Sequence, residues 1–150
     1  SLAGLTREAQ LKILELTAGK VATIFDSSMG FRHGPKSFIN EKTIMFGFVN
    51  NTPYTRDYDL DILEEVHGDE IAAGVFAIAQ PGKRNFSGST IEYSAETALL
   101  PDGYLALADI MVAQTVALLT SIKVGNKPDT PSPTGTVNRV VKGVTIYDYK

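Results

Sequence analysis

The chain has 150 residues, a net charge of −3 and a mean hydropathy near zero, with 43% hydrophobic and 21% charged residues. This length and composition exclude a mostly disordered chain and allow one domain with a buried core. Lysine and arginine are scattered rather than clustered, which argues against a dedicated nucleic-acid surface.

Reactive side chains of the metal-binding and redox kinds are scarce. The chain has no cysteine and only two histidines, so it offers no disulfide framework and no thiolate or histidine-based zinc site. It also has no recognisable signal peptide and no uninterrupted apolar run of about 18 residues. We therefore expect a cytoplasmic protein without metal or cofactor, which binds neither membranes nor nucleic acid.

The first third of the chain predicts a helix, a strand and a loop. Apolar residues recur at helical spacing over residues 5–16, and Gly19 supplies a stop. The next segment, "KVATIFD", predicts a short buried strand over residues 21–25. "SSMGFRHGP" then predicts a loop, and Pro35 suits the first turn of a following short helix.

The middle of the chain repeats this alternation. "TIMFGFVN" predicts a strand over residues 44–49, and "IAAGVFAIA" predicts another over residues 72–78. Between them, Thr55 is expected to cap a helix over residues 56–66 that Gly68 ends.

The last part predicts a loop, a strand, a long helix and a tail. Residues 80–90 are rich in Gly, Ser, Lys and Arg, and residues 90–95 predict a short fourth strand. Pro101 opens and Gly125 closes one long buried helix. The proline-rich remainder predicts an extended tail, so we expect a domain over residues 1–125 and a tail over residues 126–150.

Apolar strands that alternate with helices are typical of an α/β fold with a mainly parallel sheet and helices on both faces. Ligands bind such sheets at the carboxyl ends of the strands, and "SSMGFRHGP" follows the first predicted strand. The loop is therefore either part of an active site or a plain turn. Position alone favours neither, because strand-to-helix loops are commonly rich in Gly and Pro.

Two histidines differ in their surroundings. His33 precedes Gly34-Pro35 and is expected near a helix N-terminus, where the helix dipole favours the neutral imidazole that a proton shuttle needs. The alternative is an ordinary surface histidine. His67, in the last turn of its predicted helix, is expected to be of that ordinary kind.

Three charged residues share one face of the first predicted helix. Glu8, Lys12 and Glu15 are spaced three or four residues apart, as in a solvated ladder of ion pairs. The functional alternative is a carboxylate base next to a cation that stabilises negative charge on a reacting carbonyl. The residues alone favour the ladder.

The chain resembles the second half of two-domain SIS (sugar isomerase) proteins in three motifs that occur in the same order. These are "LK" with Glu15, then "HGP", then the closing "NRVVKGVTIY". The segments "LELTAGKVATIFDSSMGFRHGPKSFIN" and "YTRDYDLDIL" are similar to the branch of tagatose-6-phosphate ketose/aldose isomerases and galactosamine-6-phosphate deaminases. The resemblance covers nearly the whole chain. It implies a three-layer, flavodoxin-like SIS domain that acts on a sugar phosphate or amino-sugar phosphate.

The same resemblance implies roles for individual residues. Glu15 matches the carboxylate that moves a proton between C1 and C2, and Lys12 matches a lysine near the developing enediolate oxygen. His33 matches the histidine that opens the sugar ring in the neighbouring subunit's site. Lys142 matches the lysine of the closing tail, despite one extra residue before it, and Arg32 stands where a related synthase has lysine and is expected to bind substrate.

The Ser/Thr-rich loops that hold phosphate in SIS sites have no convincing counterpart here, since "SGST" at residues 87–90 falls in a late loop. We therefore expect the C-terminal SIS domain of a longer protein, with its first strand missing, that pairs with an N-terminal SIS domain and forms a homo-oligomer. A non-catalytic phosphosugar-binding module and a dimerisation scaffold, built on the apolar helix at residues 106–119, remain the alternatives.

Overall fold

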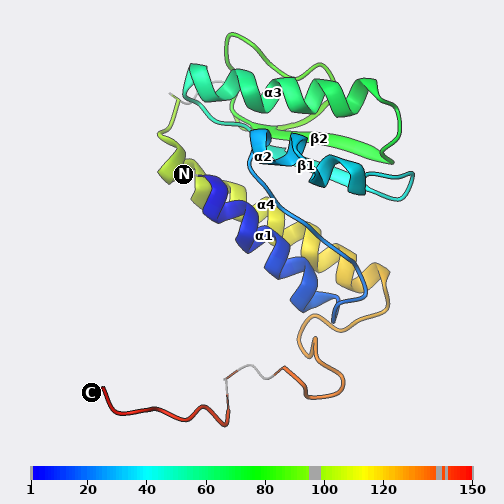
Figure 1. The fold of residues 1–150 in the computed structure, drawn as a ribbon, viewed down its shortest axis with the longest axis vertical. Coiled ribbons are helices and arrows are strands. Elements are labelled where there is room, and N and C mark those ends of the chain that lie inside the picture. The colour runs from blue at the N-terminus through cyan, green and yellow to red at the C-terminus, as the bar shows by residue number, and fades with distance from the viewer. Residues whose placement is uncertain (1, 95–98, 138–139, 141, 150) are drawn as a thin grey trace.

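The computed structural model describes residues 2–94, 99–137, 140 and 142–149. Within them, the three strands form a parallel sheet, as the alternation of apolar runs predicts. The strand order is β1-β2-β3. The strands span Ile44–Phe48 (β1), Gly74–Ala79 (β2) and Ser89–Glu92 (β3). Helix α3 (Pro53–Gly68) covers one face, and helices α1 (Leu2–Leu16) and α4 (Asp102–Lys123) cover the other (Figure 1).

The two faces follow from the alternation of side chains along each strand. Toward α3, β2 presents Val75, Ala77 and Ala79, which pack with buried α3 residues. Toward α1 and α4, Phe48 of β1 and Ile78 of β2 pack with residues of both helices. Each layer is thus held by its own apolar cluster, and a shift of one residue in register would turn both clusters inside out.

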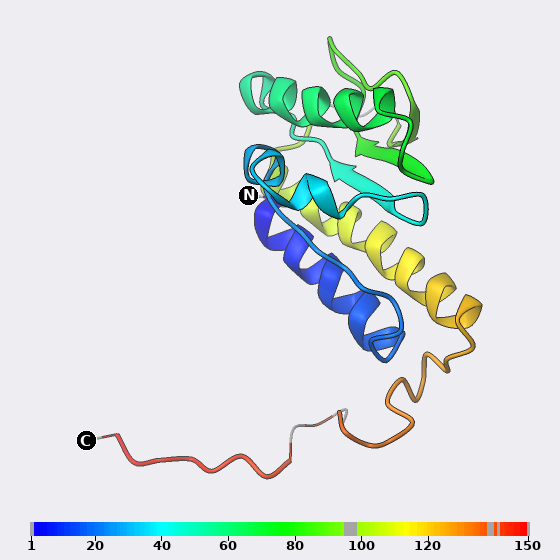
Figure 2. The same ribbon diagram turned by 45° about the vertical axis from the view of Figure 1, so that its right-hand side comes forward.

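Helices α1 and α4 lie side by side, as Figure 2 shows. Their ends are joined by a polar contact, because the Ser121 hydroxyl donates to the Leu16 carbonyl at 2.6 Å. Beyond Leu16 the helix stops as predicted: Gly19 has a φ of 72° and its N–H donates to the Leu14 carbonyl at 2.9 Å. This left-handed turn directs the chain back along the helix pair.

The predicted strand over residues 21–25 is wrong. These residues run as an extended segment outside the sheet. The Gln10 side-chain amide of α1 donates a hydrogen bond to the Thr23 carbonyl at 2.7 Å and holds the segment against this helix. Apolar composition predicts an extended backbone, but a strand also needs a neighbour to pair with. The segment instead passes over the α1–α4 pair, where Ile24 and Phe25 stay about two-fifths exposed.

The segment that follows is also more regular than a loop. It holds a short helix, α2 (Ser28–Arg32), whose N-cap Ser27 accepts from the Gly30 N–H, and a 3₁₀ turn, η1 (Pro35–Phe38). Pro35 stands in the first turn of η1, as expected. Because residues 21–25 form no strand, this segment does not follow the carboxyl end of a strand.

Helix α3 begins earlier than predicted. Thr52, not Thr55, is its N-cap, and Pro53 occupies the first turn, where a missing N–H costs nothing. The Thr55 hydroxyl instead donates back to the Thr52 carbonyl at 3.1 Å. The strand predicted over residues 90–95 is present as β3, which covers the start of that range. The end of the range, at residue 95, lies outside the described residues.

Helix α4 is as long as predicted but less buried. Its length and composition would allow it to cross a membrane, and it alone among the described helices meets that criterion. Only 28% of its most apolar window is buried. After α4, Asn126 still anchors the chain by donating to the Leu16 carbonyl at 2.6 Å, and the tail then runs away from the body (Figure 1).

Gly47 in the middle of β1 permits the close approach of α3. A Cβ atom at this position would lie 2.7 Å from a methyl of Leu63, which is fully buried and cannot move aside. We expect Gly47→Ala to lower the free energy of unfolding by about 1–3 kcal/mol, measured by urea denaturation. The matched control is Gly4→Ala in α1, which meets no atom within 4 Å and should raise stability by up to about 1 kcal/mol. Equal effects of the two changes would contradict this packing.

Candidate functional site

The α1 ladder is present. The Lys12 ammonium lies 2.9 Å from the Glu15 carboxylate and 3.3 Å from that of Glu8. The side chains are about one-quarter to two-fifths exposed, so water screens the pairs and each contributes little stability. The hydrogen bond that the Lys12 ammonium donates to Glu15 raises the pKa of Lys12 above its usual value; partial burial opposes the shift, and the bond that it donates to Glu8 adds to it.

This geometry limits the chemistry that each residue can perform. A lysine held as an ammonium cannot act as a base, but it can stabilise negative charge that develops on an oxygen nearby. Glu15 lies in the last turn of α1 with its carboxylate at the surface, where a substrate could reach it. The pair can therefore supply a proton acceptor and a cation within one hydrogen-bond distance of each other.

Arg32 and Lys36 tie the segment around His33 to α3. Arg32 pairs with Glu65 at 2.9 Å, and Lys36 pairs with both Glu65 and Asp69 at 2.6 Å. These contacts raise the pKa of Lys36, with the hydrogen bond to Asp69 as the largest cause. Since both cations are neutralised by α3 carboxylates, this surface has little free positive charge for an anion.

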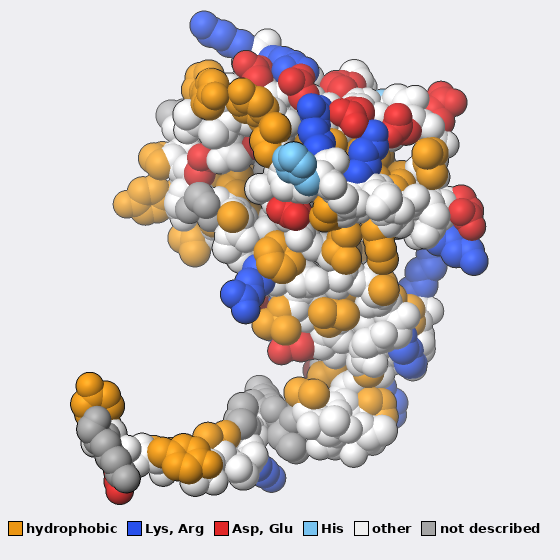
Figure 3. Space-filling view, viewed as in Figure 1, with side chains coloured by type: hydrophobic (Ala, Val, Ile, Leu, Met, Phe, Trp, Pro, Cys, Tyr) orange, Lys and Arg blue, Asp and Glu red, His pale blue; other side chains and the backbone are white. Residues whose placement is uncertain are grey.

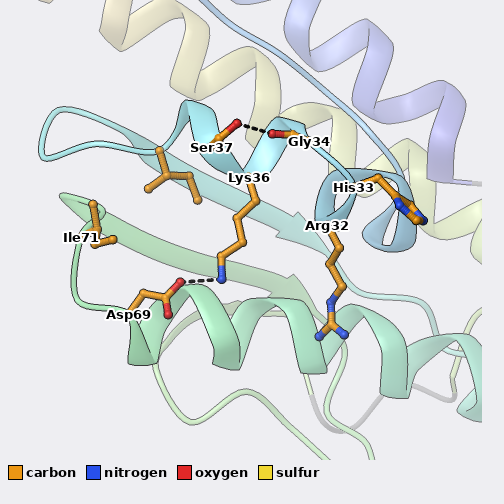
Figure 4. Close-up of a pocket in the computed structure, with 8 residues that line it drawn as sticks. Arg32, His33, Gly34, Lys36, Ser37, Asp69 and Ile71 are labelled. Carbon is orange, nitrogen blue, oxygen red and sulfur yellow. Dashed lines mark hydrogen bonds and ion pairs between the residues drawn. The ribbon is translucent and has the colours of Figure 1, made fainter.

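His33 follows α2 at the edge of an open depression of about 520 Å³. Figure 4 shows its imidazole pointing away from Arg32 and from the Lys36–Asp69 pair. The residues that line the depression are Arg32, His33, Gly34, Lys36, Ser37, Ile39, Asp69 and Ile71. The ring is thus exposed at a rim rather than enclosed in a pocket of this domain.

The predicted site residues fall into three separate places. Lys12 and Glu15 are together at the end of α1, whereas α2, which precedes His33, lies beside the sheet near the beginning of α1 (Figures 1 and 2). Lys142 is exposed in the tail that leaves the body. The structure therefore brings Lys12 and Glu15 together at one place and Arg32 and His33 at another, and it leaves Lys142 apart from both. His67 packs edge-on against Phe86, with ring centroids 5.5 Å apart.

A polar network at the carboxyl ends of β1 and β2 was missed by the sequence analysis. Its centre is Arg56 of α3, which is only 5% exposed. The guanidinium donates to the carbonyls of Asn50, Gln80 and Arg84 at 2.8–3.2 Å and to the Asn85 side chain at 2.9 Å. Burial lowers the pKa of Arg56, while Asp59 and Asp57 oppose that shift.

The same edge holds a second set of contacts around Asn51. Its backbone N–H donates to Asp102 at the start of α4, and its side-chain amide donates to Gln80 and to the Leu100 carbonyl. The Asn51 Oδ1 atom is buried and has no hydrogen-bond partner among the residues that the structure describes. An Asn-Asn pair directly after an apolar strand was the signal in the sequence that could have drawn attention to this edge.

A buried carboxylate lies between α4 and the end of β3. Asp109 is fully buried, and its Oδ1 accepts from the Tyr93 hydroxyl at 2.7 Å, whereas its Oδ2 has no hydrogen-bond partner within the described part of the chain. Burial raises the pKa of Asp109 to about 6, and repulsion from Asp102 adds to the shift, although the bond from Tyr93 opposes it. The pKa of Tyr93 is raised in turn, first by burial and then by Asp109. Among the described residues, no group of three or more His, Asp or Glu side chains could hold a metal ion.

Comparison with known proteins identifies relatives but no family model that matches the chain. D-galactosamine-6-phosphate deaminase AgaS from Escherichia coli is 47% identical over 99% of this chain, and its counterpart from Shewanella is 38% identical over 99%. The crystal structure of tagatose-6-phosphate ketose/aldose isomerase from Escherichia coli matches 99% of the chain with a TM-score of 0.84 and 41% identity. The chain is thus a homologue of these proteins, and it spans only 36–39% of their length.

Asp109 should make stability depend on pH. Its folded pKa of about 6 exceeds the usual 3.8, so the folded protein binds the proton more tightly and stability falls as pH rises from about 4 to about 6. The shift corresponds to roughly 3 kcal/mol at most. In urea titrations at several pH values, Asp109→Asn should lose this decline, and Tyr93→Phe should extend it to higher pH. Parallel stability curves for wild type and Asp109→Asn would contradict the assignment.

Proposed function

We propose that this chain is the SIS-type isomerase or deaminase domain of a longer protein that acts on a sugar 6-phosphate or amino-sugar 6-phosphate, such as tagatose 6-phosphate or galactosamine 6-phosphate. The observation that carries the proposal is the 2.9 Å contact between Lys12 and Glu15, in a chain that is 47% identical to a galactosamine-6-phosphate deaminase. Isomerisation and deamination share a proton transfer between C1 and C2. A deaminase adds the loss of ammonia from C2, with water as the co-reactant.

In this proposal, Glu15 takes the proton from one carbon and returns it to the neighbouring carbon. A single carboxylate at the surface of α1 can do both, because the two carbons lie within reach of one oxygen. Lys12, held as an ammonium by Glu8 and Glu15, stabilises the oxygen that becomes negative in the enediolate. Neither step needs a metal or an organic cofactor.

The remaining predicted residues act around this pair. His33 opens the sugar ring, and its place at an exposed rim, away from the end of α1, suits a group that serves the site of a neighbouring subunit. Arg32 binds the substrate by exchanging its ion pair with Glu65 for one with the sugar phosphate. Lys142 reaches the site from the tail, which leaves the body of the domain.

The rest of the site belongs to the longer protein. The relatives extend well beyond the matched 36–39%. In this proposal, the additional part of the longer protein carries an N-terminal SIS domain that supplies the loops for the phosphate. The whole protein is a cytoplasmic homo-oligomer. The alternative is a non-catalytic phosphosugar-binding or dimerisation module, in which Glu8, Lys12 and Glu15 form only a ladder of ion pairs.

Glu15→Gln distinguishes the enzyme from the ladder. In the longer protein, the variant should bind galactosamine 6-phosphate normally but lose about 100- to 10,000-fold in kcat, because an amide cannot accept the proton. Ammonia release and sugar isomerisation are both measured. Glu8→Gln is the matched control, since it removes the other ion pair of Lys12 at 3.3 Å, and it should keep most of the activity. Equal losses in the two variants, or normal turnover of Glu15→Gln, would assign Glu15 to the ladder.

The place of His33 predicts complementation between subunits. Chains with His33→Ala and chains with Glu15→Gln should each be inactive, but hybrid dimers should recover activity because one of the two sites regains both groups. Mixed dimers carrying two different affinity tags are isolated, so that hybrid formation is shown independently of activity. Isolated hybrids without activity would mean that both residues serve one site within the same subunit.

A further inference from the structure

Helix α4 has two apolar faces, and the described residues cover one of them. Its inner face packs on α1 and the sheet and contains Leu105, Asp109, Ala113, Ala117 and Ser121. Large apolar side chains on the outer face are 42–71% exposed, and they are Tyr104, Leu107, Met111, Leu118, Leu119 and Ile122. We call these six residues the outer face of α4.

The outer face carries no charge over its whole length. Between Asp102 and Lys123 the helix has one Asp, Glu, Lys, Arg or His residue, Asp109, which is buried on the inner face. Helix α3 differs, because Asp57 and Asp61 of its exposed side pair with Arg84. Figure 3 shows the charged side chains that gather over α3.

The exposed area is large for a surface that meets only water. Six side chains exposed to this degree offer on the order of 600 Å², the upper end of the largest apolar patch on a typical monomer. One partner in a stable protein interface contributes roughly 800 Å². The outer face, extended by the exposed Leu99 and Leu100 just before α4, approaches that size.

We propose that the outer face of α4 docks against the part of the same longer polypeptide that lies beyond these 150 residues. The matched proteins carry more than half of their length outside this fold, since the chain covers 39% of the Escherichia coli deaminase and 37% of the solved isomerase. The solved isomerase has the same fold over the matched part, with a TM-score of 0.84. A covalently linked partner has a high effective concentration, so a face of this area is enough to hold it.

The uncharged outer face determines the chemistry of the partner, and the packing of the inner face opposes a membrane-spanning role for α4. Ser121 and the buried Asp109 hold the helix against α1 and Tyr93, so one side of it is already a wall of a folded domain. The partner must be apolar and uncharged along about 27 Å, the length of 18 helical residues, as a second amphipathic helix would be. The inference rests on the part of the proposed function that places this chain in a longer protein, but not on its catalytic activity.

Photo-crosslinking identifies the occupant directly. A photoreactive phenylalanine analogue replaces Met111 in the full-length protein, and a control carries it at Ile146, which is 92% exposed in the tail. We expect crosslinks from position 111 within one polypeptide, to peptides outside the 150 residues, at least tenfold above the control. Crosslinks to residues 1–150 of a second copy, to added phosphatidylcholine vesicles, or at the control level would each overturn the proposal. An inactive protein that gives the expected crosslink would refute the proposed function alone.

Charged substitutions provide an independent test. Leu107→Glu with Met111→Glu should lower the thermal midpoint of the full-length protein by roughly 5–10 °C, because two carboxylates would be buried in the interface. Ile146→Glu with Tyr149→Glu is the matched control, since both residues are exposed in the tail, and should leave the midpoint unchanged. An unchanged midpoint for the α4 variant would show that the outer face meets only water.

Discussion

The buried guanidinium of Arg56 holds together the edge on which the rest of the fold depends. It bonds to carbonyls that follow β1 and β2 and to the turn that leads into β3. These carbonyls lie where parallel strands end, so no neighbouring strand can satisfy them. A charged donor that serves four acceptors at once fixes the ends of the strands relative to α3. Removing it would leave several buried oxygens unpaired, which costs more than the bonds themselves contribute.

The two helical layers meet different surroundings. On one side, α3 faces water with carboxylates that pair with Arg32, Lys36 and Arg84, so this face is complete within the chain. On the other side, α1 and α4 form a pair whose inner contacts are satisfied and whose outer contacts are not. The helix on one face of the sheet therefore presents paired charges to water, whereas α4 on the other face presents exposed apolar side chains. This asymmetry is what a domain of a larger protein needs, because exposed apolar area is a liability unless something covers it.

The candidate site has a similar incompleteness. Lys12 and Glu15 form a chemically coherent pair, but neither of them lines either of the two depressions found among the described residues. His33 follows α2, which lies near the beginning of α1, and Lys142 lies in the tail that leaves the body. A site built from several domains or subunits explains how such residues can share one substrate, because each domain then has to position only one or two groups. The cost is that a single domain provides few of the groups that catalysis needs.

Much of the fold could be read from local patterns in the sequence. The runs that became β1 and β2, the stop at Gly19 and the long helix α4 follow from apolar periodicity and from the properties of Gly and Pro, which act over a few residues. The spacing of Lys12 and Glu15 also determined their contact, since residues three apart on a helix are neighbours.

Other features depended on contacts between distant segments. Residues 21–25 are as apolar as a strand, yet they pair with none of the three strands in the described residues. The burial of Arg56 and Asp109 was equally hidden, because a charged residue in a helix is read as exposed until the opposing layer is known. The distance between the α1 pair and His33 was set by how α2 packs on α3. In each case the sequence determined what a segment can do alone, and only the tertiary structure decided which partner it meets.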